Sequence, residues 1–228
     1  MVKHVVISGA AGQLGRVVCR EFLAAGYFVH ALVSKNDTTV WDLSSGFVAI
    51  HKLDLTDKLE VEQFISLLKQ SKIAVHAALF LAGGYAEGTI QNTSRDQINM
   101  MFKVNFDTAF YLSQALFNEM NALNADGYLF FVGARPAIEP EKGSNAVAYT
   151  LSKSALLNLA QLYSLAPDNV NIHVHVIIPS IIDTPVNRAN MPEADFSKWI
   201  TPEFISQRII HIINRKDNPG LIVKMYAD

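Results

Sequence analysis

The sequence predicts an α/β fold in which a doubly wound parallel sheet of about seven strands carries helices on both faces. Three observations lead to this prediction. Short apolar segments rich in β-branched residues alternate with segments of helical periodicity along the chain. Three glycines, Gly9, Gly12 and Gly15, lie between the first strand and the first helix. The length of 228 residues suits one large α/β domain and is too short for two, so residues 1–228 are expected to form a single domain.

The elements follow from local patterns. Each predicted strand is a short apolar run, and each predicted helix repeats apolar residues at a spacing near 3.6. The strands are expected at 3–7, 27–33, 46–53, 74–81, 128–132, 172–178 and 221–225. The helices are expected at 14–25, 59–68, 95–123 and 147–166, with a last one beginning near 202. Such alternation predicts parallel strands that are covered on both faces.

The glycine-rich turn is the first candidate site. Glycines allow a close backbone approach, and the following helix offers free N–H groups to an anion such as a pyrophosphate. A G-x-x-G-x-x-G run by itself also occurs in ordinary loops. In this strand–turn–helix context it predicts a Rossmann dinucleotide site that includes Gly9, Gly12, Gln13, Leu14 and Gly15.

Composition narrows the possible partners. The formal net charge is −2 and the basic residues are scattered, which favours neither nucleic acid nor an anionic membrane surface. The single Cys19 excludes an intramolecular disulfide and is expected to be a packed thiol. We find no signal peptide or membrane-spanning pattern, so a cytoplasmic location is expected. The seven histidines show no metal-ligand spacing, so no metal is expected.

Residues after the second and third strands bear on cofactor choice, because ligands bind beyond the carboxyl ends of parallel strands. Ser34 and Lys35 stand where an NAD-selective fold usually has an acidic residue, and they favour the 2′-phosphate of NADP. Lys35 is equally interpretable as a solvated loop residue. The nearby acidic residue Asp37 leaves NAD as an alternative cofactor. Asp54 is a candidate for the adenine edge, whereas Asp57 is expected to cap the next helix.

Asn105 lies in the middle of an apolar helical stripe. A buried amide without partners costs a few kcal/mol. Asn105 is therefore either a structural hydrogen-bonding device or part of the active site, and its spacing alone does not decide between them.

Tyr149 and Lys153 share a face of the helix that begins near Val147, and Leu156 and Ala160 continue that face. A phenol normally titrates near ~10, and a nearby ammonium favours the phenolate. The pair therefore predicts a tyrosine that serves as acid or base. The alternative is an accidental pair on a surface helix.

Together these motifs resemble the short-chain dehydrogenase/reductase family, over essentially the whole chain. The matching motifs are Ser8-Gly9-x-x-Gly12-x-x-Gly15, Ala82-Gly83-Gly84, Val104-Asn105, Tyr149-x-x-x-Lys153 and Pro179…Asp183-Thr184-Pro185. Within the family the chain is most similar to the dihydropteridine reductases, through 81–86, 132–135 and 183–199.

The resemblance implies roles for individual residues. Tyr149 is expected to donate a proton while hydride arrives from the nicotinamide, and Lys153 to bind the ribose and lower the tyrosine's pKa. Asn105 is expected to hold a water. The expected cofactor contacts are Gly9, Gly12, Gln13, Leu14, Gly15, Ser34, Lys35, Asp54, Leu55, Ala82, Gly83, Gly84, Tyr149, Lys153, Pro179, Ile182 and Thr184.

One departure bears on the substrate. Most members have a serine after the fifth strand, but here that strand ends in Val132-Gly133-Ala134-Arg135. Dihydropteridine reductases resemble this chain in lacking the serine, and their quinonoid substrate is an activated acceptor. The favoured expectation is an NAD(P)H-dependent reductase of a quinonoid dihydropteridine. The alternatives are a generic carbonyl or ketone reductase and a non-catalytic NAD(P)-binding regulator.

Two further features concern substrate cover and assembly. Residues 183–200 are expected to form a loop over the substrate. In this loop Phe196 and Trp199 are expected either to stack on a flat heterocycle or to pin the loop to the core, with pinning favoured for Trp199.

A small-to-apolar stripe on the Tyr149 helix, together with the helix bearing Asn105, predicts a dimer or tetramer, unless the chain's own loops cover it. The stripe residues are Ala148, Ser152, Ala155, Leu159 and Leu162.

Overall fold

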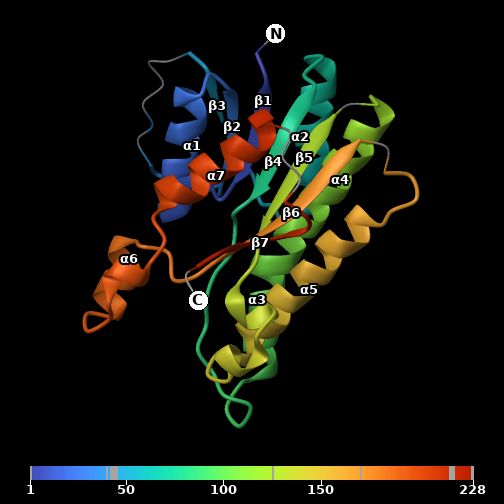
Figure 1. Cartoon of the computed structure of the whole chain (residues 1–228). Coiled ribbons are helices and arrows are strands. Elements are labelled where there is room, and N and C mark those ends of the chain that lie inside the picture. Colours follow the sequence, from blue (N-terminus) through green and yellow to red (C-terminus); the bar gives the residue numbers. More distant parts are fainter. Residues whose placement is uncertain are drawn as a thin grey trace.

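A computed structural model describes residues 2–39, 41, 46–124, 126–169, 171–215 and 219–226. Within these residues seven parallel strands form one sheet in the order β3-β2-β1-β4-β5-β6-β7, which confirms the predicted fold class (Figure 1). The strands are β1 His4–Ser8, β2 Phe28–Val33, β3 Val48–Lys52, β4 Val75–Phe80, β5 Gly127–Val132, β6 Ile172–Pro179 and β7 Ile222–Met225.

Helices cover both faces of this sheet. They are α1 Gln13–Ala24, α2 Lys58–Gln70, α3 Arg95–Phe102, α4 Thr108–Ala122, α5 Val147–Ser164, α6 Pro185–Asn190 and α7 Pro202–Arg215. Helices α1 and α7 pack on one face, and α2, α4 and α5 pack on the other (Figure 1). Adjacent residues of β5 serve opposite layers: Phe130 packs with the α1–α7 side and Phe131 with the α4–α5 side. This alternation explains why the strands are apolar on both faces.

The predicted long helix 95–123 is interrupted. A π-helical segment, Lys103–Asp107, separates α3 from α4. The apolar stripe continues through the interruption, so sequence periodicity does not reveal it. Such π segments are frequently found at functional sites, and this one carries Asn105.

The predicted loop 183–200 also contains structure. Its first part forms α6, which projects away from the sheet (Figure 1). The Thr184 hydroxyl caps α6 by accepting a hydrogen bond from Asn187 N at 3.2 Å. Trp199 is buried, which confirms the prediction that it pins this segment to the core.

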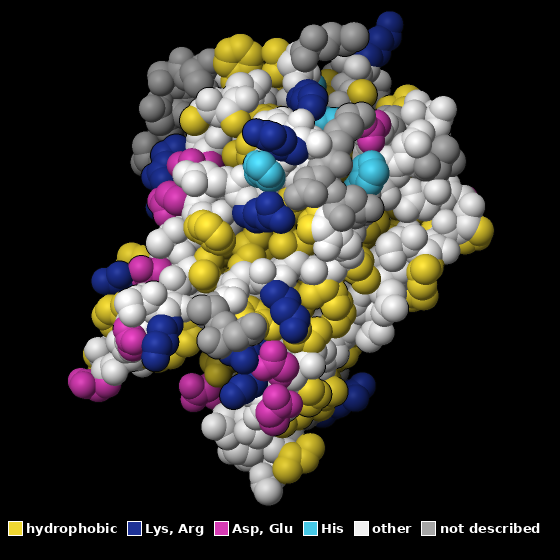
Figure 2. Space-filling view, in the orientation of Figure 1, with side chains coloured by type: hydrophobic (Ala, Val, Ile, Leu, Met, Phe, Trp, Pro, Cys, Tyr) yellow, Lys and Arg dark blue, Asp and Glu magenta, His cyan; other side chains and the backbone are white. Residues whose placement is uncertain are grey.

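The strand order reverses between β1 and β4, because β2 and β3 extend the sheet one way and β5 to β7 the other. Connections leaving β1 and β4 therefore diverge, and the crevice beyond their carboxyl ends is where a ligand binds in such sheets. Figure 2 shows acidic and basic side chains interspersed on the surface of one face. Among the described residues no helix is long and apolar enough to cross a membrane, and no group of three or more His, Cys, Asp or Glu could hold a metal ion.

Candidate functional site

The turns after β1 and β4 contact each other at the point where the strand order reverses. Ser8 Oγ accepts hydrogen bonds from Leu81 N at 3.0 Å and Ala82 N at 3.2 Å. Gly9 has φ +63°, and a Cβ there would lie 2.7 Å from Ala82 N. Only glycine satisfies both constraints, so the turn cannot accept a side chain at this position.

The N-terminus of α1 faces outward from this turn. Its N-cap is Gly12, which provides no side-chain hydrogen bond, and its first turn contains no acidic residue. The first N–H groups of a helix have no partner within the helix. Gln13 and the backbone around it are exposed, so these donors are available to an anion, as a dinucleotide pyrophosphate requires.

The Asn105 side chain clamps the turn after β4. Its Oδ1 accepts from Gly84 N at 2.9 Å, and its Nδ2 donates to Gly84 O at 3.1 Å and to Ser152 Oγ at 3.0 Å. Asn105 is fully buried, and these partners satisfy its amide. The structure therefore assigns its side chain a positioning role, and the water expected from the resemblance stays a prediction.

Lys153 lies beside Gly83. Its Nζ donates to Val132 O at 2.9 Å, and a Cβ built on Gly83 would lie 3.5 Å from Nζ. Lys153 is only 7% exposed, and this is its one hydrogen bond among the described residues. An ammonium has three donors, so two of them can serve the hydroxyls of a ribose that approaches over Gly83. The residues present thus fit a nicotinamide ribose.

Burial dominates the protonation of both Tyr149 and Lys153. It lowers the pKa of Lys153 to about 8 and raises the pKa of Tyr149 to about 12, with a smaller rise from the nearby Tyr85 phenol. The expectation that Lys153 lowers the Tyr149 pKa is therefore wrong for this structure. Desolvation outweighs the attraction, because Nζ is directed at the Val132 carbonyl and both groups are withdrawn from water.

The residues that follow β2 are not arranged as expected for a 2′-phosphate contact by Lys35. Lys35 is exposed and forms an ion pair with Glu60, so its charge is already neutralised. The Asp37 carboxylate is occupied by Thr39, whose hydroxyl donates to it at 2.7 Å. Arg16, which the sequence reasoning overlooked, donates from Nη2 to the same Thr39 hydroxyl at 3.1 Å. Its position directly after Gly15 in the first turn of α1 was the available signal.

The third strand ends in residues that serve the chain itself. Asp57 accepts from Leu59 N at 2.9 Å, which confirms that it caps α2. Asp54 Oδ1 accepts from both the backbone N and the hydroxyl of Thr56, at 2.8 and 2.7 Å. Leu55 is buried. The proposed adenine contact of Asp54 would have to share its carboxylate with this turn.

Residues after β6 border the same crevice. Pro179 ends β6, and Ile182 forms an isolated parallel bridge with Ile200. This bridge closes the base of the segment that contains α6. The Thr184 hydroxyl accepts from Asn187 N in capping α6, so its own O–H remains able to donate to a ligand.

Phe196 packs within this segment. Its ring centroid lies 4.7 Å from that of Trp199 and 4.6 Å from the Arg188 guanidinium carbon. Arg188 is itself fixed by two hydrogen bonds to Asp183, at 2.6 and 2.7 Å. These contacts favour pinning for Phe196 as well.

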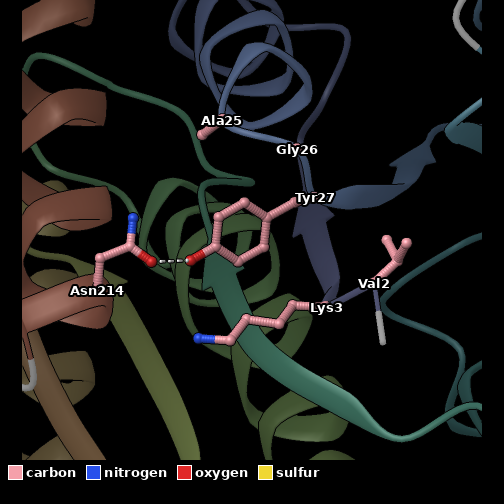
Figure 3. A pocket seen from close by; sticks show the side chains of 6 residues that line it. All are labelled: Val2, Lys3, Ala25, Gly26, Tyr27 and Asn214. Carbon is pink, nitrogen blue, oxygen red and sulfur yellow. Dashed lines mark hydrogen bonds between the residues drawn. The ribbon is translucent and has the colours of Figure 1, made fainter.

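A separate cavity of about 470 Å³ lies away from this crevice (Figure 3). It is lined by Val2, Lys3, Ala25, Gly26, Tyr27 and Asn214. Lys3 and Tyr27 precede β1 and β2, so this cavity is at the amino ends of the strands. The Tyr27 hydroxyl donates to Asn214 Oδ1 at 2.8 Å, so the polar groups that face each other there are already paired.

Comparisons with known proteins identify the family of this chain. The family model for short chain dehydrogenase matches residues 3–195. The dihydropteridine reductase of Dictyostelium discoideum is 24% identical over 225 residues, covering 96% of this chain and 90% of that protein. A D-arabinitol 2-dehydrogenase (ribulose-forming) of Candida tropicalis is 26% identical over 206 residues, covering 82% of this chain and 72% of that protein.

Among solved structures, the fold matches a short chain dehydrogenase from Leptospira borgpetersenii with bound NAD+. Its TM-score is 0.85 at 16% identity, covering 99% of this chain and 92% of that one. At 16% identity this match supports the fold and nothing further. The family model spans most of the chain and includes the glycine turn, Asn105, Tyr149 and Lys153. The chain therefore belongs to the short-chain dehydrogenase family of oxidoreductases.

Proposed function

We propose that the chain is an NAD(P)H-dependent reductase whose substrate is a quinonoid dihydropteridine. The observation that carries this proposal is the buried ammonium of Lys153 beside Gly83, at the crevice where the strand order reverses, with Tyr149 one helical turn earlier on α5. The relative from Dictyostelium supports the substrate, since the two proteins correspond along most of their lengths. The methyl group of Ala134 supports it too, because an activated acceptor needs less polarisation than a ketone.

The chemistry requires one hydride and one proton. A bound reduced nicotinamide supplies the hydride, that is, two electrons and one hydrogen nucleus. Tyr149 supplies the proton from its hydroxyl and is reprotonated from solvent. Because burial raises its pKa to about 12, the phenol carries its proton at neutral pH. Lys153 would hold the nicotinamide ribose and so fix the distance between the hydride donor and the acceptor atom of the substrate. This positioning is the main contribution of the protein.

We propose NADP over NAD as the cofactor, on the basis of Arg16 in place of Lys35. Arg16 reaches toward Thr39 beyond the end of β2, where the adenosine ribose lies in a fold of this type. Its guanidinium forms no ion pair among the described residues, whereas Lys35 is paired with Glu60.

The test compares NADH and NADPH oxidation by the purified protein with three acceptors: quinonoid dihydropterin, ribulose and an aromatic ketone. The proposal predicts the highest kcat/KM with the dihydropterin and loss of turnover in Tyr149→Phe. The C. tropicalis relative favours a carbonyl reductase as the second candidate, and a preference for ribulose or the ketone would support it. Binding of NAD(P)H without turnover of any acceptor would favour the regulator.

We also propose self-association through α4 and α5. The expected stripe is only partly available, because Ala148 and Ser152 are buried against the chain itself. Leu162, the last residue of the stripe, is 67% exposed, and Leu151 beside the stripe on α5 is 47% exposed. The proposal predicts that Leu162→Glu lowers the mass measured by light scattering to that of a single chain. An unchanged mass would remove α5 from the interface.

A further inference from the structure

Tyr85 is a large aromatic residue held at the mouth of the site. Its side chain is 61% exposed, yet its ring packs edge-on against Tyr149, with ring centroids 5.1 Å apart and an interplanar angle of 69°. The hydroxyl of Tyr85 makes no hydrogen bond to the described residues. An exposed ring of this kind adds little to the core, so its position needs another explanation.

The backbone on both sides of Tyr85 is fixed. Gly84 is bound through its N–H and its carbonyl by the Asn105 amide. Gly88 donates from N to Asn145 O at 2.8 Å and accepts from Val147 N at 2.9 Å. Tyr85 thus lies in a short span that is tied at one end to the Asn105 clamp and at the other to the start of α5. Its exposure therefore does not imply freedom of the backbone.

The segment after β5 lacks a hydroxyl. Ala134, 6% exposed, is the second residue after β5, where the family resemblance predicts a serine. Lys153 binds the carbonyl of Val132, two residues earlier, so position 134 lies close to the reacting groups. Reduction builds electron density on the acceptor atom, and a preorganised donor stabilises it there. Tyr149 alone supplies such a donor unless a second group takes part.

We propose that the Tyr85 hydroxyl donates a hydrogen bond to the acceptor atom of the substrate and supplies the second donor that Ala134 cannot. This inference rests on the proposed function. The two phenols have different tasks: Tyr149 gives up its proton, whereas Tyr85 keeps its proton and stabilises the charge that develops. Burial, together with the charge of Glu87, raises the pKa of Tyr85, which keeps it a donor through the neutral range.

The experiment measures kcat/KM for quinonoid dihydropterin with the preferred cofactor. Tyr85→Phe keeps the ring and removes only the hydroxyl, and we expect a loss of about 10- to 100-fold, mostly in kcat. A serine at position 134 should restore the donor, so Ala134→Ser in the Tyr85→Phe background should recover about 3- to 10-fold, which is half of that loss on a logarithmic scale. Tyr111→Phe, on α4 and away from the site, is the matched control and should equal the wild type.

The outcomes separate this inference from the function on which it rests. Wild-type turnover that Tyr149→Phe abolishes but Tyr85→Phe leaves unchanged would overturn the role of Tyr85 alone. A loss in Tyr85→Phe that Ala134→Ser does not relieve would also overturn it, because the hydroxyl would then not replace a serine. Absence of turnover in the wild type would overturn both. Tyr85→Phe should leave the Kd for NADPH, measured by fluorescence, within about 2-fold of the wild type, since the hydroxyl acts on the acceptor.

Discussion

Asn105 Nδ2 donates to Ser152 Oγ at 3.0 Å, and this bond joins the π-helical segment to the helix that carries Tyr149 and Lys153. Ser152 Oγ in turn donates to the Tyr149 carbonyl at 2.7 Å. Since Asn105 also holds Gly84, one buried amide connects the turn after β4 with the helix that carries Tyr149. The crevice walls are therefore coupled through a side chain that need not touch substrate.

Asn105→Ala should destabilise the protein and reduce turnover together. It removes the three hydrogen bonds of a buried amide, to Gly84 N, Gly84 O and Ser152 Oγ, and we expect a loss of about 2–4 kcal/mol in the free energy of unfolding. Ser152→Ala removes only one bond to Asn105 and should cost about 1 kcal/mol. Urea denaturation of both variants checks the order. Equal effects would show that the Gly84 clamp contributes little.

Lys153→Met should stabilise the protein at pH 7 and abolish its activity. Burial lowers the pKa of Lys153 to about 8 from its usual 10.5, so the folded state disfavours the ammonium. The destabilisation caused by burying the ammonium is greatest below about pH 8. Between about pH 8 and 10.5 the unfolded chain binds a proton at Lys153 that the folded protein does not, so this destabilisation decreases as the pH rises.

The gain in Lys153→Met should accordingly be about 1–3 kcal/mol at pH 7 and should vanish near pH ~10.5. Thermal unfolding measured across this range tests the trend. The exposed Lys142→Met is the matched control and should show no such dependence. A gain that is constant with pH would mean that packing rather than charge accounts for it.

Three histidines on neighbouring strands predict acid sensitivity. His30 bonds with His4 at 3.0 Å and with His51 at 3.1 Å, and burial lowers the pKa of His30 to about 3. Because the unfolded chain takes up this proton near pH 6.5, stability should fall as the pH drops from about 6.5 toward 3, by up to about 1.4 kcal/mol per pH unit.

His30→Gln should flatten this part of the pH profile, since glutamine keeps a donor and an acceptor but does not titrate. The exposed His211→Gln serves as the control and should retain the wild-type slope. Urea midpoints measured between pH 4 and pH 8 decide the matter. Parallel curves for wild type and His30→Gln would remove His30 as the source of the acid sensitivity.

Arg16→Ala should weaken NADPH binding by about 10-fold and leave NADH binding within about 2-fold, because a charge-assisted hydrogen bond to a phosphate contributes about 1.5 kcal/mol or more. Lys35→Ala should affect neither cofactor selectively, since Glu60 already neutralises Lys35. Fluorescence titration measures the Kd of each variant for each cofactor, and each value is divided by the wild-type Kd. A selective loss in Lys35→Ala alone would restore the assignment made from sequence.

The sequence by itself determined the features that depend on residues close together along the chain. The alternation of strands and helices, the glycine turn and the Asp57 cap each arise within a few residues, so spacing and residue type suffice. The Tyr149–Lys153 pair is equally local, because residues four apart share a helix face. The absence of a hydroxyl at Ala134 could likewise be read directly.

The tertiary structure decided what depends on contacts across the sheet. The Asn105 clamp forms with a turn 21 residues away, and the Lys35 ammonium is paired with the Glu60 carboxylate, 25 residues away. The Tyr149 pKa rises because the folded chain withdraws the phenol from water, against the expectation from its lysine neighbour. Tyr85 meets Tyr149 only because Gly84 and Gly88 are tied to different helices. Hydrogen bonding, desolvation and charge pairing act through space, and the fold brings these partners together.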